Sequence, residues 1–248
     1  MFRVLVAVLL LLLSSCASTG GSSGDGESAA EINVRLGLGY LQQGRPKLAI
    51  DNLKRAIELD PKLADAHHYA AEAYRQLEQY AFADEHFQKA LKLTPNDSAV
   101  KNNYGVYLCD RRKYAEADKL FVEVAADEYY RAPAEALENA GICARKAGDD
   151  VLAATRFREA AEFDGKRART LYQLADLSHE AGEHFNARGF IQRYFSVAPA
   201  NAPSLWLAIR IEKALGNDEE IREYAKVLHR NYPDSKEAKE FKQFWATQ

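Results

Sequence analysis

The amino-acid sequence predicts an all-α protein, a right-handed solenoid of six consecutive helix pairs with a C-terminal capping helix. Small residues recur every 34 positions, as at Ala49, Ala83 and Ala117. Prolines follow the same period, since Pro61 precedes Pro95 by 34 residues. A fixed period of this length is typical of helix pairs that stack on their neighbours along one axis.

A second column of small residues repeats with the same spacing and marks the first helix of each pair. The step from Ala117 to Ala153 is 36 residues instead of 34, which places two extra residues near 129–131. In the last unit, Ile209 and Ile221 stand where the other units carry small residues. The first-helix column comprises Gly37, Ala71, Gly105, Gly141 and Ala175.

The order of residues within a unit resembles the tetratricopeptide repeat (TPR), in which Leu-Gly-x-x-Tyr is followed by Ala-x-x-x-Phe and then Pro. The second unit carries Ala71, Tyr74, Ala83, Phe87 and Pro95 in that order. The resemblance implies two antiparallel helices per unit, with the first helices forming a concave surface. The predicted units are 30–63, 64–97, 98–133, 134–167, 168–201 and 202–235, and residues 236–248 are the predicted capping helix.

Glycines mark the predicted turn inside four of the six pairs, because glycine adopts turn conformations without steric cost. They are Gly44, Gly148, Gly182 and Gly216. The third unit departs from this pattern, since its turn reads Asp110-Arg111-Arg112.

The first 29 residues predict export and lipid attachment. A ten-residue apolar run from Val4 to Leu13 has the length of a signal-peptide core, about half that of a membrane-spanning helix. The segment Leu13-Ser14-Ser15-Cys16 resembles a lipobox, which implies a signal peptide over 1–15 and diacylglycerol on Cys16. The Gly- and Ser-rich stretch over 16–29 is a predicted flexible tether. An ordinary secretory signal with an incidental cysteine is the alternative.

The composition favours a protein-binding scaffold over an enzyme. The formal net charge is −3, with basic and acidic residues interspersed, so no nucleic-acid partner is expected. No Gly-x-Ser-x-Gly or phosphate-binding loop occurs, and the six histidines lack metal-ligand spacing. We expect no catalytic residues, no metal, no cofactor and no small-molecule substrate.

The partner-binding surface is predicted on the first helices, after Leu36, Gly37 and Tyr40 are assigned to the core. Three apolar residues of the first unit would then be open to water, which is typical of a docking groove. The alternative is that these three residues are capping positions covered by the linker. The predicted partner-binding residues are Val34, Leu38, Leu41, His68, Glu72, Arg75, Asn102 and Val106.

Two central segments carry a more specific resemblance. The segment Asn102-Asn103-Tyr104-Gly105 is followed by Leu108-Cys109, and Asn139-Ala140-Gly141 is followed by Cys143. This chain resembles the pilotin lipoproteins of type IV pilus biogenesis. The resemblance implies a lipid-anchored protein of the outer membrane, facing the periplasm. It also implies binding to type IV pilus secretin subunits, whose localisation and multimerisation it promotes.

A different class of function stays open from the sequence, a periplasmic TPR adaptor for cell-wall enzymes or for outer-membrane protein assembly. The absence of Asp after Cys16 favours the outer membrane, by analogy with lipoprotein sorting in other bacteria.

The two cysteines downstream of the lipobox form a predicted disulfide. Exported proteins fold in an oxidising compartment, and Cys109 and Cys143 lie on the first helices of consecutive units. Helices that run side by side can bring facing Cα atoms to the separation that a disulfide requires. Two buried free thiols are the alternative.

Overall fold

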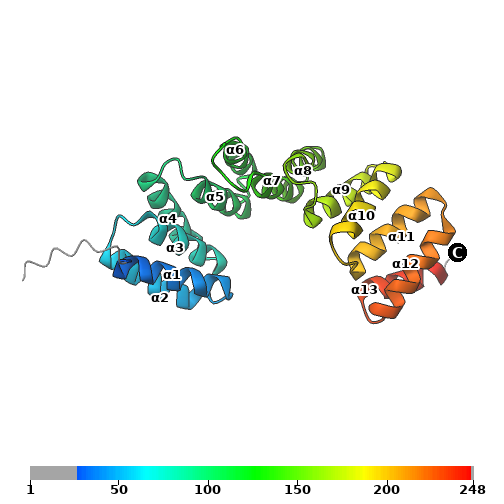
Figure 1. Cartoon of the computed structure of the whole chain (residues 1–248), viewed down its shortest axis with the longest axis horizontal. Coiled ribbons are helices and arrows are strands. Elements are labelled where there is room, and N and C mark those ends of the chain that lie inside the picture. Colours follow the sequence, from blue (N-terminus) through cyan, green and yellow to red (C-terminus); the bar gives the residue numbers. More distant parts are fainter. Residues whose placement is uncertain (1–26, 247–248) are drawn as a thin grey trace, which may run out of the picture.

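The computed structural model describes residues 27–246, and this part of the chain is entirely helical (Figure 1). It confirms the predicted all-α solenoid. Each predicted unit contributes an antiparallel pair, and a thirteenth helix follows the sixth pair. The helices are α1 (Ala29–Gln42), α2 (Pro46–Leu59), α3 (Ala64–Gln76), α4 (Tyr80–Leu93), α5 (Ser98–Asp110), α6 (Tyr114–Ala125), α7 (Pro133–Ala147), α8 (Asp150–Phe163), α9 (Ala168–Glu180), α10 (His184–Val197), α11 (Ala202–Leu215), α12 (Asp218–Asn231) and α13 (Lys236–Ala246).

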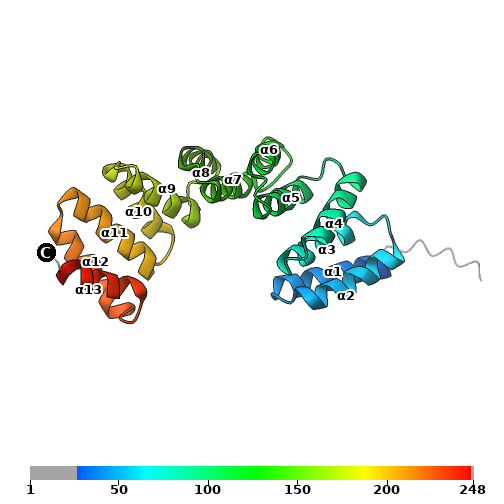
Figure 2. The same ribbon diagram turned by 180° about the vertical axis from the view of Figure 1, so that it is seen from behind.

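The helix pairs follow one another along an arch. Figures 1 and 2 show α6 and α8 on the outer side of its middle, with α5, α7 and α9 on the inner side. Each helix packs against its partner within the unit and against the next unit. The concave face is therefore lined by the first helices of the central units.

Each pair is held together by a small residue facing a large one. A Cβ atom added to Gly105 would lie 2.7 Å from Phe121, and one added to Gly141 would lie 2.8 Å from Phe157. Both phenylalanines are fully buried. The first unit uses the same arrangement with Gly37 and Leu53. The small-residue column thus allows the close backbone approach that buries the large side chains.

The sixth unit reaches the same packing with the sizes exchanged. Ile209 replaces the small residue, and Ala225 stands sixteen positions later, where the other units carry Leu, Phe or Ile. Both belong to one buried cluster with Ile221. The small side chain of Ala225 makes room for Ile209, which is why the irregular unit still folds as a pair.

The turns inside the pairs share one left-handed position, including those that lack glycine. Gly44, Gly148, Gly182 and Gly216 have φ between 68° and 81°. Glu78 and Arg112 occupy the same repeat position with φ of 57° and 61°. The third-unit turn therefore keeps the shape of the others despite its sequence. These two residues carry the steric cost that glycine avoids.

The N-terminal boundary differs from the prediction. Helix α1 begins at Ala29, inside the stretch predicted as tether. Ser28 caps it, since its hydroxyl accepts a hydrogen bond from the Glu31 backbone N–H while the Glu31 carboxylate accepts one from the Ser28 N–H. This reciprocal capping box fixes the helix start. The predicted signal peptide and Cys16 lie outside the described residues.

The capping helix packs on the last unit. Ala238 and Phe241 are buried against α11 and α12, in a cluster with Leu228. The Ser235 hydroxyl accepts a hydrogen bond from the Ala238 N–H. The side chains of 244–248 lie outside the described ones.

Candidate functional site

The candidate site is the concave face formed by the first helices. Equivalent positions on consecutive first helices line up along this face, so its surface can be described as columns of side chains. Four of the eight predicted partner-binding residues are half-buried there, and four are buried.

The predicted apolar groove in the first unit is largely wrong. Val34 and Leu41 are each only 8% exposed and belong to the core. With Gly37 they form one i, i+3, i+7 stripe of α1, which packs against both α2 and α3. Leu36, assigned to the core from the sequence, is 49% exposed instead.

Leu38 is the predicted groove residue of the first unit that is partly open. It is half-buried and lines a cavity of about 450 Å³ with Leu63 and Tyr69. The rim of this cavity is charged, with Glu27, Glu31, Arg35 and Asp65 around the opening. The first unit thus offers a small apolar recess with a polar border.

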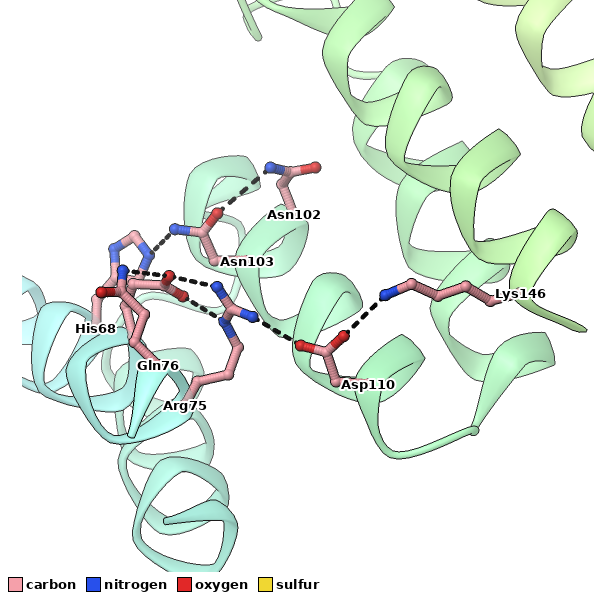
Figure 3. Close-up of polar contacts among 8 residues, drawn as sticks. His68, Arg75, Gln76, Asn102, Asn103, Asp110 and Lys146 are labelled. Atoms are coloured by element: carbon pink, nitrogen blue, oxygen red, sulfur yellow. Dashed lines mark hydrogen bonds and ion pairs between the residues drawn. The ribbon is translucent and has the colours of Figure 1, made fainter. Parts of the chain in front are cut away.

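Polar side chains connect the first helices of units two, three and four. Asn103 Nδ2 donates to His68 Nε2 over 2.8 Å, and Asn139 Nδ2 donates to Asn102 Oδ1 over 3.2 Å. Figure 3 shows His68, Asn103 and Asn102 along this row. His68 and Asn102 are buried, so the prediction that water reaches them is wrong. Burial lowers the pKa of His68, which keeps its ring neutral and able to accept.

A ladder of ion pairs runs beside this row. Arg75 on α3 binds Glu72 and Asp110 at 2.7 Å each, and Lys146 on α7 reaches the other Asp110 oxygen at 3.1 Å (Figure 3). The hydrogen bonds that Arg75 donates to Glu72 raise the pKa of Arg75, with burial opposing the shift, and Arg75 therefore stays charged. Glu72 and Arg75 were predicted to bind a partner, and the structure places Arg75 in an ion pair with the next repeat while Glu72 binds Arg75 on the same helix.

The ladder continues into the C-terminal units. Arg145 binds Asp176 at 2.9 Å and Glu180 at 2.9 Å, and Arg210 on α11 lies 3.5 Å from the other Asp176 oxygen. The concave face from α3 to α11 therefore carries alternating charges that are largely neutralised by one another.

Between the amides and the charges lies a small apolar floor at the centre of the arch. Val106 on α5 and Ile142 on α7 occupy equivalent repeat positions, and both are half-buried. Neither Ile142 nor Asn139 was predicted as a site residue. The 36-residue step that aligns Gly105 with Gly141 also aligns Asn103 with Asn139 and Val106 with Ile142. Asn139 and Ile142 could therefore have been predicted from the sequence.

A disulfide joins the two helices that carry this floor. The structure joins Cys109 on α5 to Cys143 on α7, with Cα atoms 5.7 Å apart, and both residues are buried. It connects the two units at the irregular 36-residue step. Oxidation of the pair in the exported protein stays a prediction.

The arrangement suits recognition of another polypeptide. The half-buried amides of Asn103 and Asn139 can hydrogen-bond a peptide backbone, and the adjoining Val106 and Ile142 offer apolar contact. Within residues 27–246 no group of three or more His, Cys, Asp or Glu side chains is arranged to hold a metal ion. No helix among the described ones has the length and hydropathy to cross a membrane.

Comparison with known proteins is consistent with these observations. A TPR repeat profile matches residues 37–77, and a tetratricopeptide repeat profile matches residues 64–97. The type IV pilus assembly protein PilF of Pseudomonas aeruginosa is 30% identical over 242 residues, covering 96% of each chain. An uncharacterised protein of Haemophilus influenzae is 31% identical over 66% of this chain and 91% of its own.

Two solved structures share the fold over most of this chain. PilW, described as a widely conserved type IV pilus biogenesis factor, superposes with a TM-score of 0.76 at 30% identity, covering 87% of this chain and 99% of its own. The Pseudomonas aeruginosa PilF structure gives a TM-score of 0.75 at 31% identity, with coverage of 87% and 97%. The chain therefore belongs to the family of type IV pilus assembly proteins that includes PilF and PilW.

Proposed function

We propose that this protein is an outer-membrane lipoprotein, a pilotin that binds type IV pilus secretin subunits and promotes their localisation and multimerisation. Pilus assembly and twitching motility would depend on it. The observation that carries the proposal is the match to PilF and PilW, which extends over nearly the whole chain and includes all six repeats.

The mechanism follows from a binding surface tied to a membrane. Acyl chains on Cys16 give membrane affinity without a spanning helix, and two or more chains make the attachment stable. The solenoid then holds a secretin segment against its concave face. Restricting bound subunits to the membrane surface raises their effective concentration, which favours ring assembly.

Deletion of the gene and complementation test the function directly. Cells without this protein should lose membrane-associated secretin multimers and twitching, and the wild-type gene should restore both. Affinity purification of the complemented protein should recover secretin. Recovery of cell-wall enzymes or outer-membrane assembly factors, together with normal secretin multimers in the deletion strain, would contradict the proposal.

The lipid anchor is tested by Cys16→Ser. The variant should take up no labelled fatty acid and should leave the outer-membrane fraction, while its helical content stays normal. A Cys16→Ser protein that still fractionates with the outer membrane would contradict the anchor.

The recess around Leu38 supplies a sharp surface test. Leu38→Glu should reduce secretin binding and multimer formation, because it places a carboxylate in the half-buried apolar recess. Leu36→Glu is the matched control, since Leu36 lies two residues away and is half exposed. Leu41 is excluded from the test because it belongs to the core. Equal effects of the two variants, or normal multimers in a folded Leu38→Glu protein, would contradict secretin binding at this recess.

A further inference from the structure

The solenoid carries a second feature, the grooves between the second helix of one unit and the unit that follows it. The second, third and fifth units carry a charged residue at the same repeat position, and its side chain bonds to the following unit. Asp84 accepts a hydrogen bond from the Tyr104 hydroxyl at 3.2 Å, Asp118 binds the Arg156 guanidinium at 2.7 and 2.8 Å, and Arg188 binds Glu212 at 2.5 and 2.9 Å. These bridges tie each of those units to its neighbour.

Two units carry an apolar residue at the same repeat position. An apolar side chain cannot form this polar bridge to the following unit. They are the first unit, with Ile50, and the fourth, with Ala154. The structure has a cavity at each place, of about 590 Å³ beside Ile50 and about 370 Å³ beside Ala154. The two cavities are the same groove of the solenoid, repeated where the bridging side chain is missing.

The groove beside Ala154 lies between α8 and the end of α9, on the right half of the arch in Figure 1. Its floor is apolar, formed by Ala154, Leu177 and Ala181. Val151 stands at its edge and is 81% exposed. Phe185, in the same repeat position one unit later, is 77% exposed. Val151 and Phe185 therefore present apolar side chains to water on consecutive second helices.

The charges around this groove are unevenly distributed. Asp150, Glu180 and Glu183 line one end, and Arg145 is shared by Asp150, Glu180 and Asp176. Arg158 lines the groove eight residues after Asp150, about 12 Å further along α8. Arg158 forms no ion pair among residues 27–246. The end near Asp150 therefore keeps an excess of negative charge beside the apolar floor.

We propose that the groove between α8 and α9 is a second docking site, which takes a cationic amphipathic segment of a partner protein. Apolar side chains of that segment cover Val151 and the floor, and its Lys or Arg side chains face Asp150, Glu180 and Glu183. The α8 side of the site lies on the outer side of the arch (Figure 1), and its Glu180 end meets the charge ladder of the concave face.

The groove in the first unit has the opposite charge and serves as an internal control. It is lined by Lys47 and Lys54, with Glu85 opposite and Phe82 exposed at its edge. A cationic segment is disfavoured there by like charge. The two grooves thus occupy equivalent places in the repeat and differ in the sign of their charge.

The test uses the mature protein and a synthetic helical peptide of about 18 residues, with leucines on one face and lysines beside them. Binding is followed by fluorescence anisotropy and by methyl NMR shifts of Val151 and Leu177. We expect Val151→Asn to weaken binding about fivefold, and Glu183→Gln to weaken it and reduce its salt dependence. Val151 is exposed and Glu183 makes no capping hydrogen bond to α10, so both variants should fold.

Phe82→Ser, in the oppositely charged groove, should leave the affinity unchanged. A matched peptide with glutamates in place of the lysines should bind at least about tenfold more weakly. The proposal is overturned if the lysine peptide does not bind, if the glutamate peptide binds as well, or if Phe82→Ser weakens binding as much as Val151→Asn does.

Discussion

Cys109 and Cys143 face each other across the only irregular step of the repeat, with their Cα atoms 5.7 Å apart on α5 and α7. The disulfide closes a loop between residues 34 apart in the sequence and joins the third unit to the fourth. It joins the two helices that carry Val106 and Ile142, so it also braces the centre of the concave face.

We expect the exported protein to contain this bond and to lose about 3–4 kcal/mol of stability on reduction, by the loop-entropy argument. Mass spectrometry after alkylation without reduction should show a two-hydrogen deficit and no alkylated cysteine in the repeats. Urea unfolding with and without reductant gives the energy, and a Cys109→Ala, Cys143→Ala variant controls for effects of the reductant elsewhere. Two alkylated cysteines in the native protein would rule out the bond.

Glu78→Gly and Arg112→Gly should each stabilise the protein by about 0.5–1 kcal/mol. Both residues sit at positive φ, where a side chain costs about 1–2 kcal/mol and glycine costs little apart from its entropy. Gly182→Ala, at the equivalent turn, should destabilise by a similar amount. Thermal unfolding measures all three, and a stability loss in both glycine variants would show that side-chain contacts outweigh the backbone cost.

Gly105→Ala should destabilise by about 1–3 kcal/mol, because the new methyl group overlaps the buried ring of Phe121. Gly39→Ala is the matched control within a first helix. A Cβ there meets nothing within 4 Å, so this change should stabilise α1 by about 0.5–1 kcal/mol. If the two substitutions shift the unfolding midpoint equally, close packing does not explain the small-residue column.

Stability should fall in mild acid through a pair of histidines. His67 Nε2 lies 3.1 Å from the Pro61 carbonyl, which can only accept, so His67 Nδ1 accepts from the Nδ1–H of His86 at 3.0 Å. Burial lowers the pKa of both rings, that of His86 to about 4. Because the pKa of each ring is lower in the folded protein, the unfolded chain binds protons at a higher pH than the folded protein does as the pH falls. The stability is therefore full above about pH 6.5 and falls as the pH drops toward 4.

The expected loss between pH 7 and pH 5 is about 1 kcal/mol from this pair, since the partial exposure of His86 screens the effect. Urea unfolding at several pH values measures it. His86→Gln should flatten the dependence. An identical pH slope in wild type and His86→Gln would contradict this assignment.

Arg188→Met should destabilise the protein by about 3–5 kcal/mol. The Glu212 carboxylate is 1% exposed, and burial raises its pKa while Arg188 opposes the shift. Removing the guanidinium leaves a buried charge with only the Asn217 side-chain amide as its partner among the contacts described. The double variant Arg188→Met, Glu212→Leu should regain most of the loss, and failure to recover would assign the effect to packing.

The repeat can be predicted from the sequence alone. A 34-residue period, small residues opposite large ones and prolines after the second helices follow from how two helices pack, which is a local matter. The same register aligned Gly105 with Gly141 and placed the two cysteines on neighbouring helices. These features can be predicted without knowing how the neighbouring units are oriented, as long as the units stack.

Which first-helix residues reach water depends on the packing of neighbouring units and could not be predicted from the sequence pattern. Val34, Leu41, His68 and Asn102 lie on the helix face that the sequence assigned to the groove, yet the following unit covers them. Each first helix contacts its own partner helix and the units on both sides, so its buried arc depends on how neighbouring units tilt. That tilt is set by long-range contacts such as Arg75–Asp110 and Asp118–Arg156, which join residues more than 30 positions apart. The residue pattern of a single helix does not predict these long-range contacts.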